Sequence, residues 1–454
     1  MHKSSTSSVD MLSGNIYRNM FIFALPLIAS GVLQQSFNSV DVAVVGRFIG
    51  HHALAAVGSN GPVINLIVNL FLGISVGANV VIANYIGRSD KDGVRRAIST
   101  AVALAFLSGV LLLCVGSSVA TPILHALGTP DDVLEAATVY LRIYSVGMPF
   151  MMVYNFGAAI LRSFGDTKRP FYALLAGGLV NVCLNLFFVL ICGMGVDGVA
   201  WATVISNCVS ASIIFIVLTR EQDPYCVRIK KMSLRHKVEL SKILKIGVPA
   251  GIQGMVFSFS NVFIQSAINT FGSDAMAGSA AAINFELYGY FIISAFAQSV
   301  VAFTGQNNGA GNLKRCGQVL KAGLVMSFIG SLCFDMTVCV FAPEAVSIFT
   351  TVPAVIAFAV TRIHCGTTFQ FIACSYEMAG ASLRGQGYSM TPTVITVIGT
   401  CLLRLAWVMV VRGHDGTFGE LLIIYPVTWV VTGIAMLAAR AVITRRLMKG
   451  VSEA

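Results

Sequence analysis

Long apolar runs separated by short polar segments are the main pattern of this chain. Each run holds about twenty or more mostly hydrophobic residues, enough for a helix to cross a hydrocarbon core of about 30 Å. Backbone polar groups in lipid must bond within their own segment, so each run is expected to be a helix. We predict twelve spans, near residues 20–46, 57–85, 95–119, 136–160, 171–192, 197–219, 246–271, 277–304, 317–341, 356–381, 391–411 and 420–443. The pattern therefore predicts an all-α polytopic membrane protein.

The second half of the chain repeats the first half. Near the two starts the shift is 223 residues, and later it is 222; the matched residues are Pro26/Pro249, Gly31/Gly254, Asn38/Asn261, Leu161/Leu383, Arg162/Arg384, Gly165/Gly387 and Pro170/Pro392. Six spans in each half make both halves enter the membrane with the same orientation. We therefore expect two parallel six-helix lobes related by a pseudo-two-fold axis along the membrane normal. The N-terminal lobe is placed at 1–219, a basic cytoplasmic linker and flexible tether at 220–245, and the C-terminal lobe at 246–454.

Composition and charge support a membrane protein and fix its expected orientation. Of the 454 residues, 56% are hydrophobic and only 11% are charged, which is far below the charge content of soluble proteins. With both termini in the cytoplasm, twenty-five of the thirty Lys and Arg residues fall on that side, as the positive-inside rule expects. The net charge of +10 comes from segments that flank spans, so it does not indicate nucleic-acid binding.

No pattern typical of an enzyme or of a bound cofactor occurs in the chain. The eleven Cys residues lie mostly inside apolar spans with no Cys-x-x-Cys pair, and the seven His residues show no paired spacing. No nucleophile elbow or phosphate loop is present. We therefore expect neither an enzyme nor a cofactor, apart from a coupling ion.

Asp41 is the first candidate for function, because a carboxylate inside a span is costly and usually faces a protein interior or a water-filled cavity. Gln34, Asn38 and Asp41 follow at i, i+4 and i+7, which makes one polar stripe on an apolar helix. The alternative is a buried, hydrogen-bonded Asp that only joins helices. We favour an ion or proton site.

Polar residues in three further spans could complete such a site. Asn181 and Asn185 share a face of the fifth span, Thr203 lies near the start of the sixth, and Asn155 lies in the fourth. Amide and hydroxyl oxygens around a carboxylate suit Na⁺, or hydrogen bonds that tune a proton carrier. Each residue alone is more typical of interhelical hydrogen bonding.

The second half contributes the intramembrane acids Glu286, Asp335 and Glu377. Glu377 is the repeat mate of Asn155, and we place Glu286 and Glu377 in a substrate cavity with Gln253 and Asn261 of the seventh span. Asp335 lies nearer the outer surface, so solvation and burial both stay open. Arg404 is expected to form a structural ion pair with one of the acids.

Tyr140, Tyr144, Met148 and Met151 form a helical stripe in the fourth span. Such side chains suit an adaptable pocket for flat lipophilic cations. Plain packing is the alternative. The pairs Gly73/Gly77 and Gly247/Gly251 permit close approach of helices and carry no functional information alone.

Several motifs in the correct order resemble one transporter family. They are the segments 38–50 (NSVDVAVVGRFIG), 53–58 (ALAAVG), 161–167 (LRSFGDT), 198–203 (GVAWAT), 305–312 (GQNNGAGN) and 383–387 (LRGQG). Together they resemble the multidrug and toxic compound extrusion (MATE) family, closest to its bacterial DinF-like and MepA-like members. The resemblance covers almost the whole chain.

The resemblance implies a V-shaped pair of six-helix lobes that exports amphipathic, mostly cationic compounds in exchange for Na⁺ or H⁺ by alternating access. It implies an ion site, with Na⁺ as one occupant, at Asp41, Asn181, Asn185 and Thr203, and Asn155 as a further ligand. Asn185 stands where the family often has Asp, which leaves the ion open. The expected setting is the bacterial inner membrane, and the expected active form is a monomer.

Three alternatives remain open. A lipid-linked precursor flippase of the same superfamily would need a strongly cationic cavity, yet only three Lys or Arg residues lie in the spans. A major-facilitator transporter also has parallel halves, and the loop 87–96 weakly resembles its loop motif. A channel would more naturally be oligomeric than internally duplicated.

Overall fold

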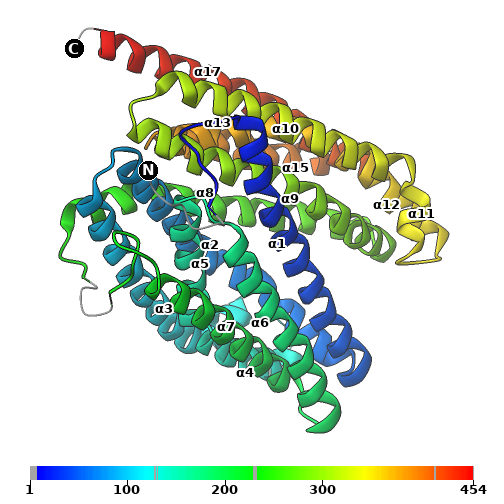
Figure 1. Cartoon of the computed structure of the whole chain (residues 1–454). Coiled ribbons are helices and arrows are strands. Elements are labelled where there is room, and N and C mark those ends of the chain that lie inside the picture. Colours follow the sequence, from blue (N-terminus) through cyan, green and yellow to red (C-terminus); the bar gives the residue numbers. More distant parts are fainter. Residues whose placement is uncertain (1–7, 127–128, 130, 229–232, 414–415, 453–454) are drawn as a thin grey trace. The chain divides into compact units, whose positions relative to one another are not determined.

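The computed structural model describes residues 8–126, 129, 131–228, 233–413 and 416–452, and within them the regular structure is helical, with short turns and loops between the helices. Figure 1 shows the helices along the chain. In the first half they are α1 (Ile16–Val44), η1 (Val45–Ile49), α2 (His51–Gly87), α3 (Lys91–Ala126), α4 (Asp131–Val146), α5 (Met148–Ser163), α6 (Lys168–Leu186), η2 (Phe187–Ile191) and α7 (Val196–Thr219). In the second half they are α8 (Lys237–Asn269), α9 (Ser273–Gly309), α10 (Leu313–Val340), α11 (Ala342–Ser347), α12 (Pro353–Cys365), η4 (Thr367–Ala373), α13 (Cys374–Gly385), α14 (Met390–Thr396), η5 (Val397–Leu402), α15 (Leu403–Gly413), α16 (Phe418–Leu422) and α17 (Ile424–Ser452).

The predicted all-α membrane fold is confirmed. In the described residues, eleven helical runs are long and apolar enough to cross a bilayer, and a bent pair of helices supplies the twelfth span. That pair is α4 and α5, which meet at an angle of 47° on either side of Gly147. Pro149 lies in the first turn of α5 and has no N–H to bond the preceding turn, so the predicted single span 136–160 breaks there.

The tenth span is also interrupted. Helix α12 ends at Cys365, the segment η4 forms tight 3₁₀ turns, and α13 continues from Cys374. The sequence predicted one continuous helix over 356–381. A 3₁₀ stretch inside a helix bonds its backbone less well than an α-helix does and often marks a functional position.

Contacts divide the chain into two compact units. Unit 1 comprises Met1–Val9 and Ala29–Gly251, and unit 2 comprises Asp10–Ile28 and Ile252–Ala454. Most of each predicted lobe lies in one unit, but the first part of α1 belongs to unit 2. There, Phe23 packs edge-on against Phe303 at 5.6 Å between ring centroids, and the Asn307 amide donates to the Met11 carbonyl at 3.0 Å.

Within unit 1, helices α2 and α8 approach each other at glycines. A Cβ added to Gly73 would lie 2.1 Å from the Gly251 nitrogen, and one added to Gly77 would lie 2.8 Å from the Gly247 nitrogen. The two glycine pairs from the sequence therefore face each other. Only glycine permits this backbone contact, because any side chain would separate the helices.

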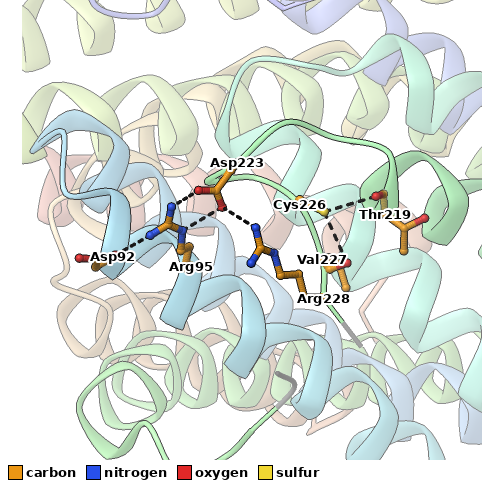
Figure 2. Close-up of polar contacts among 7 residues, drawn as sticks. All are labelled: Asp92, Arg95, Thr219, Asp223, Cys226, Val227 and Arg228. Carbon is orange, nitrogen blue, oxygen red and sulfur yellow. Dashed lines mark hydrogen bonds and ion pairs between the residues drawn. The ribbon is translucent and has the colours of Figure 1, made fainter. Parts of the chain in front are cut away.

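The described part of the basic linker is anchored to unit 1. Figure 2 shows the contacts of this segment. Arg95 of α3 donates from Nε to Asp223 at 2.8 Å, and Arg228 lies 3.8 Å from the same carboxylate. The Cys226 thiol lies 3.3 Å from the Thr219 carbonyl. Helix α8 begins at Lys237, inside the segment predicted as linker. The linker is thus an anchored segment over these residues and not only a flexible tether.

Candidate functional site

Asp41 lies near the end of α1, partly buried, one turn before the π-helical segment η1. Its hydrogen-bond partner is the Asn185 side chain, whose Nδ2 donates to Asp41 Oδ1. Asn185 is fully buried and lies just before a second π-helical segment, η2. π-Helical turns widen a helix by one residue and frequently occur at functional sites. Asp41 and Asn185, the two residues of this hydrogen bond, therefore each lie beside a π-helical segment.

A chain of polar side chains extends from Asp41 across two more positions. Asn185 Nδ2 also lies 3.3 Å from Asn181 Oδ1, and Asn181 Nδ2 lies 3.4 Å from Thr203 Oγ1. Thr203 in turn donates to the Val199 carbonyl at 3.1 Å. The structure thus brings together all four residues of the predicted ion site, from α1, α6 and α7.

The electrostatic character of this site is set by what surrounds the carboxylate. Among the described residues, no Lys or Arg forms an ion pair with Asp41, and its hydrogen-bond donor is a neutral amide. The buried Asn185 Oδ1 has no hydrogen-bond partner within the described ranges. An ionised carboxylate away from water is costly without a compensating charge. The arrangement is therefore suited to bind a cation or a proton.

An apolar cluster lies directly beside this polar chain. Its buried members are Val44, Val45, Ala53, Tyr140, Val189, Val196, Val199 and Ala200, and Tyr144 packs against them. The Tyr140 and Tyr144 rings stack with centroids 6.0 Å apart. One side of the site is thus dry, which strengthens every electrostatic interaction within it.

The other first-half candidates do not join this chain. Asn155 is bonded to its own helix, with Nδ2 donating to the Met151 carbonyl at 2.9 Å. Gln34 and Asn38 are exposed on α1. Met148 is buried and Met151 is partly buried. Tyr140 and Met148 thus sit in the packed interior of unit 1, and their place in a substrate cavity stays a prediction.

The acids Glu286 and Glu377 of unit 2 each have an arginine. Arg362, only 3% exposed, donates to both oxygens of Glu286, at 2.7 and 2.9 Å. Arg384 lies 3.8 Å from Glu377 and donates to Gln253 Oε1 at 3.0 Å. The Arg362 partner could not be predicted from the sequence, because it lies 76 residues from Glu286 and on another helix. Arg384 follows Glu377 by seven residues on α13, a spacing that places both on one helix face and could have indicated this pair.

The expected ion pair of Arg404 is wrong. Its guanidinium is buried over the Tyr425 ring at 4.5 Å and lies 3.4 Å from Asn261 Oδ1, and no carboxylate pairs with it among the described residues. Arginine stacks well on aromatic rings, so this cation is held by π-electrons and neutral oxygens. The solvated interpretation of Asp335 is also wrong, since that side chain is fully buried.

Comparison with known proteins decides the family. The MatE family model matches residues 26–187 and, a second time, 249–410. This chain belongs to the MatE family. The two matched segments are offset by 223 residues, the difference between 249 and 26, so the duplication read from the sequence is confirmed. The major-facilitator alternative is overturned.

Relatives of similar length support this assignment. The chain is 29% identical over 391 residues to a probable multidrug resistance protein, YoeA of Bacillus subtilis, covering 84% of each chain. It is 29% identical over 426 residues to the probable multidrug resistance protein NorM of Thermotoga maritima, covering 89% of this chain and 88% of that protein. A protein of Shewanella oneidensis described as an FAD transporter is 25% identical over 440 residues, covering 94% of each.

Solved structures share the fold. An outward-facing multidrug resistance MATE family transporter superposes with a TM-score of 0.90 at 23% identity, covering 98% of this chain and all of the other. The family match and these relatives confirm the predicted class: this MatE protein is a multi-pass membrane transporter and not an enzyme. The sequence could not show the π-helical turns beside Asp41 and Asn185, because no residue pattern marks them.

Proposed function

We propose that this MatE protein is a cation-coupled antiporter that exports amphipathic, mostly cationic small molecules, with H⁺ or Na⁺ as the coupling ion. The observation that carries the proposal is the Asp41 carboxylate, which is bonded to a neutral amide and has no basic partner among the described residues. The proposed setting is the bacterial inner membrane, with both termini in the cytoplasm and the monomer as the active form.

Coupling requires that Asp41 bind its ion differently in two conformations. A ligand with equal affinity for two states shifts no equilibrium, so ion binding must favour one access state and ion release the other. Protonation or Na⁺ binding removes the net charge of the site, and that change in charge is the physical difference between the states. Alternating access follows from the same requirement.

The residues present fit either ion. For Na⁺ the oxygens would come from Asp41, Asn181, Asn185 and Thr203, and oxygen ligands are what hard cations prefer. For H⁺ the same amides would hold the carboxyl group by hydrogen bonds. One carboxylate in the set balances one monovalent cation, so charge alone does not separate the two.

The substrate class rests on the relatives, two of which are described as probable multidrug resistance proteins. The relative described as an FAD transporter carries an anionic compound, and a lipid-linked precursor would also be anionic. Either of these would need basic groups facing the substrate. In unit 2, Arg362 and Arg384 are paired with Glu286 and Glu377, and the buried Arg404 guanidinium is held against the Tyr425 ring, which favours cations.

The test is transport into proteoliposomes that contain the purified full-length chain. A pH gradient and a Na⁺ gradient are imposed in separate experiments. In one of them, a fluorescent organic cation should accumulate against its own concentration gradient. Asp41→Asn should lower coupled transport on the order of tenfold or more, because a charge-assisted interaction is worth about 1.5–3 kcal/mol. Asp92→Asn is the matched control, since the Asp92 carboxylate is 73% exposed.

Undiminished coupled transport by the Asp41→Asn protein would refute the coupling role. Transport of FAD or of a lipid-linked sugar, with no transport of cations, would refute the substrate class and leave the ion site standing. The gradient that drives uptake identifies the ion.

A further inference from the structure

Asp335 of α10 is a buried acid that has no basic partner in the part of the chain that the structure describes. Its side chain is fully buried, and Ser331 one turn earlier donates to Oδ2 at 2.8 Å. The backbone N–H of Phe371 also lies against the carboxyl group. The other oxygen, Oδ1, has no hydrogen-bond partner. Unlike Glu286 and Glu377, this carboxylate meets only neutral groups.

A second orphaned oxygen points to the same place. Gln370 of η4 is buried; its Nε2 donates to the Glu286 carbonyl at 2.9 Å, and its Oε1 has no partner. A Cβ added to Gly289 of α9 would lie 2.8 Å from Asp335 Oδ1 and 2.8 Å from Gln370 Oε1. Since each oxygen would lie 2.8 Å from the same Cβ position, the two oxygens are at most 5.6 Å apart, which is twice 2.8 Å. Both lie next to the backbone of Gly289, which has no side chain.

The broken tenth span explains why oxygens gather here. Thr367 and Gln370 are three residues apart in the 3₁₀ segment η4, so their side chains share one face. The Thr367 hydroxyl is fully buried and has no partner either. Irregular backbone at membrane depth is tolerated where protein buries it or where it lines a polar site. Two unpartnered oxygen atoms, Asp335 Oδ1 and Gln370 Oε1, therefore lie beside Gly289, and Thr367 shares the η4 face of Gln370.

We propose that Asp335, Gln370 and Thr367 form a binding site for one small monovalent cation, a proton or Na⁺, inside unit 2. Asp335 Oδ1 and Gln370 Oε1 are two unpartnered acceptors that repel each other, whereas a cation or a carboxylic O–H would satisfy both, and the Thr367 hydroxyl could add a further oxygen. Gly289 leaves the space that the ligand needs. This site shares no residue with the Asp41 site, and it can be tested by binding alone, so it does not depend on the proposed export function.

The groups that face Asp335 are uncharged, so none of them neutralises the carboxylate in place of a bound cation. They are Ser331 on its own helix, Gly289 of α9, Gln370 and Phe371 of η4, and Cys374 of α13. The arginines on the elements packed against α10 are engaged elsewhere: Arg362 of α12 with Glu286, and Arg384 of α13 with Glu377.

Equilibrium binding of ²²Na⁺ to the purified protein in nanodiscs, together with the infrared band of protonated carboxyl groups, tests the site. Both are measured in an Asp41→Asn background, so that the first site is silent. We expect Na⁺ binding, or a protonated-carboxyl band, that Asp335→Asn abolishes. Loss of Na⁺ binding identifies Na⁺, and loss of the band identifies the proton.

Gly289→Ala provides a variant that keeps the charge. Its methyl group would occupy the space between the two oxygens, and we expect the cation affinity to fall on the order of tenfold. Gly330→Ala is the matched control: its Cβ would meet only the Cγ2 methyl group of Ile292, at 3.1 Å, and affinity should not change. This pair still tests the site if Asp335→Asn does not fold.

The proposal fails if neither signal depends on Asp335, or if Gly289→Ala and Gly330→Ala behave alike. That result is expected if the Gln370 amide is rotated, so that Nε2 donates to an ionised Asp335 that binds no ligand.

Discussion

Two ways of holding a carboxylate inside the membrane can be compared in this protein. In unit 2, Glu286 is bonded at both oxygens by Arg362, and Glu377 lies beside Arg384. In unit 1, Asp41 is bonded by the neutral amide of Asn185. Both units descend from one duplicated sequence, as the double family match shows. A built-in cation neutralises an acid permanently, whereas a neutral partner leaves the charge to be balanced by an ion that can leave.

This difference separates structural acids from acids that could be coupled to an ion. Breaking a buried ion pair leaves an uncompensated charge and is strongly destabilising. Removing the charge of an acid that has no basic partner removes the free-energy cost of keeping that charge away from water. Stability and transport should therefore respond in opposite ways at the two kinds of site.

The largest effect is expected at Arg362. Arg362→Met would leave Glu286 without its cation, and we expect the free energy of unfolding to fall by about 3–5 kcal/mol. The measurement is thermal and denaturant unfolding of the purified protein in detergent. Asp41→Asn is the comparison, and it should change the free energy of unfolding by less than about 1 kcal/mol.

The double variant Arg362→Met with Glu286→Gln should recover most of that loss, because both charges are then absent. A single Arg362→Met protein as stable as wild type would show that Glu286 is not held by this pair, and the comparison between the units would lose its basis.

A smaller loss is expected at Arg384. Its Nη2 lies 3.8 Å from Glu377 Oε2, a longer contact than the pair of Arg362. Glu377 also has the Tyr290 hydroxyl 3.5 Å away. We expect Arg384→Met to cost about 1–3 kcal/mol, the cost of a buried polar group that loses one of its partners. A loss in the free energy of unfolding that equals or exceeds the loss for Arg362→Met would contradict the expectation that the longer ion pair contributes less.

Asp10, outside the membrane spans, is expected to give the smallest effect. Burial works against ionisation here, but hydrogen bonds from Ser13 and the Leu12 N–H, together with the Arg315 charge, outweigh it and hold the pKa of Asp10 below its usual value. Since the folded pKa is lower than the unfolded one, the stabilisation is present above the unfolded pKa, about 3.9, and is lost as the pH falls through the folded value.

Comparing the unfolding midpoints of wild type and Asp10→Asn tests this sign. The wild type should lose its small advantage only below about pH 4. An advantage that instead grows as the pH falls would reverse the assignment.

Much of the fold followed from local patterns. Run length and apolar content predicted the spans, since lipid admits only helices whose backbone bonds are internal. The repeat of Pro26 in Pro249 and of Arg162 in Arg384 predicted the duplication. The spacing of Asn181 and Asn185, with Asp41 and Thr203, predicted four residues that the fold brings together.

The rest depended on contacts between distant segments. The sequence suggested Arg404 as the partner of an acid, but the fold places that guanidinium on the Tyr425 ring and gives Arg362 to Glu286, 76 residues away. The sequence did not decide whether Asp335 is buried or exposed to solvent. Nothing in the run 356–381 marked the 3₁₀ turns of η4 or the shared space over Gly289.

The sequence by itself determined the class of this protein, its spans, its duplication and the identity of the residues at the Asp41 site. Those features depend on which residues occur and at what spacing along one helix. The tertiary structure alone decided which acids have a permanent cation and which have none. Ion pairing depends on distances between side chains from different helices, and a few ångströms there separate a structural salt bridge from a carboxylate that needs an ion.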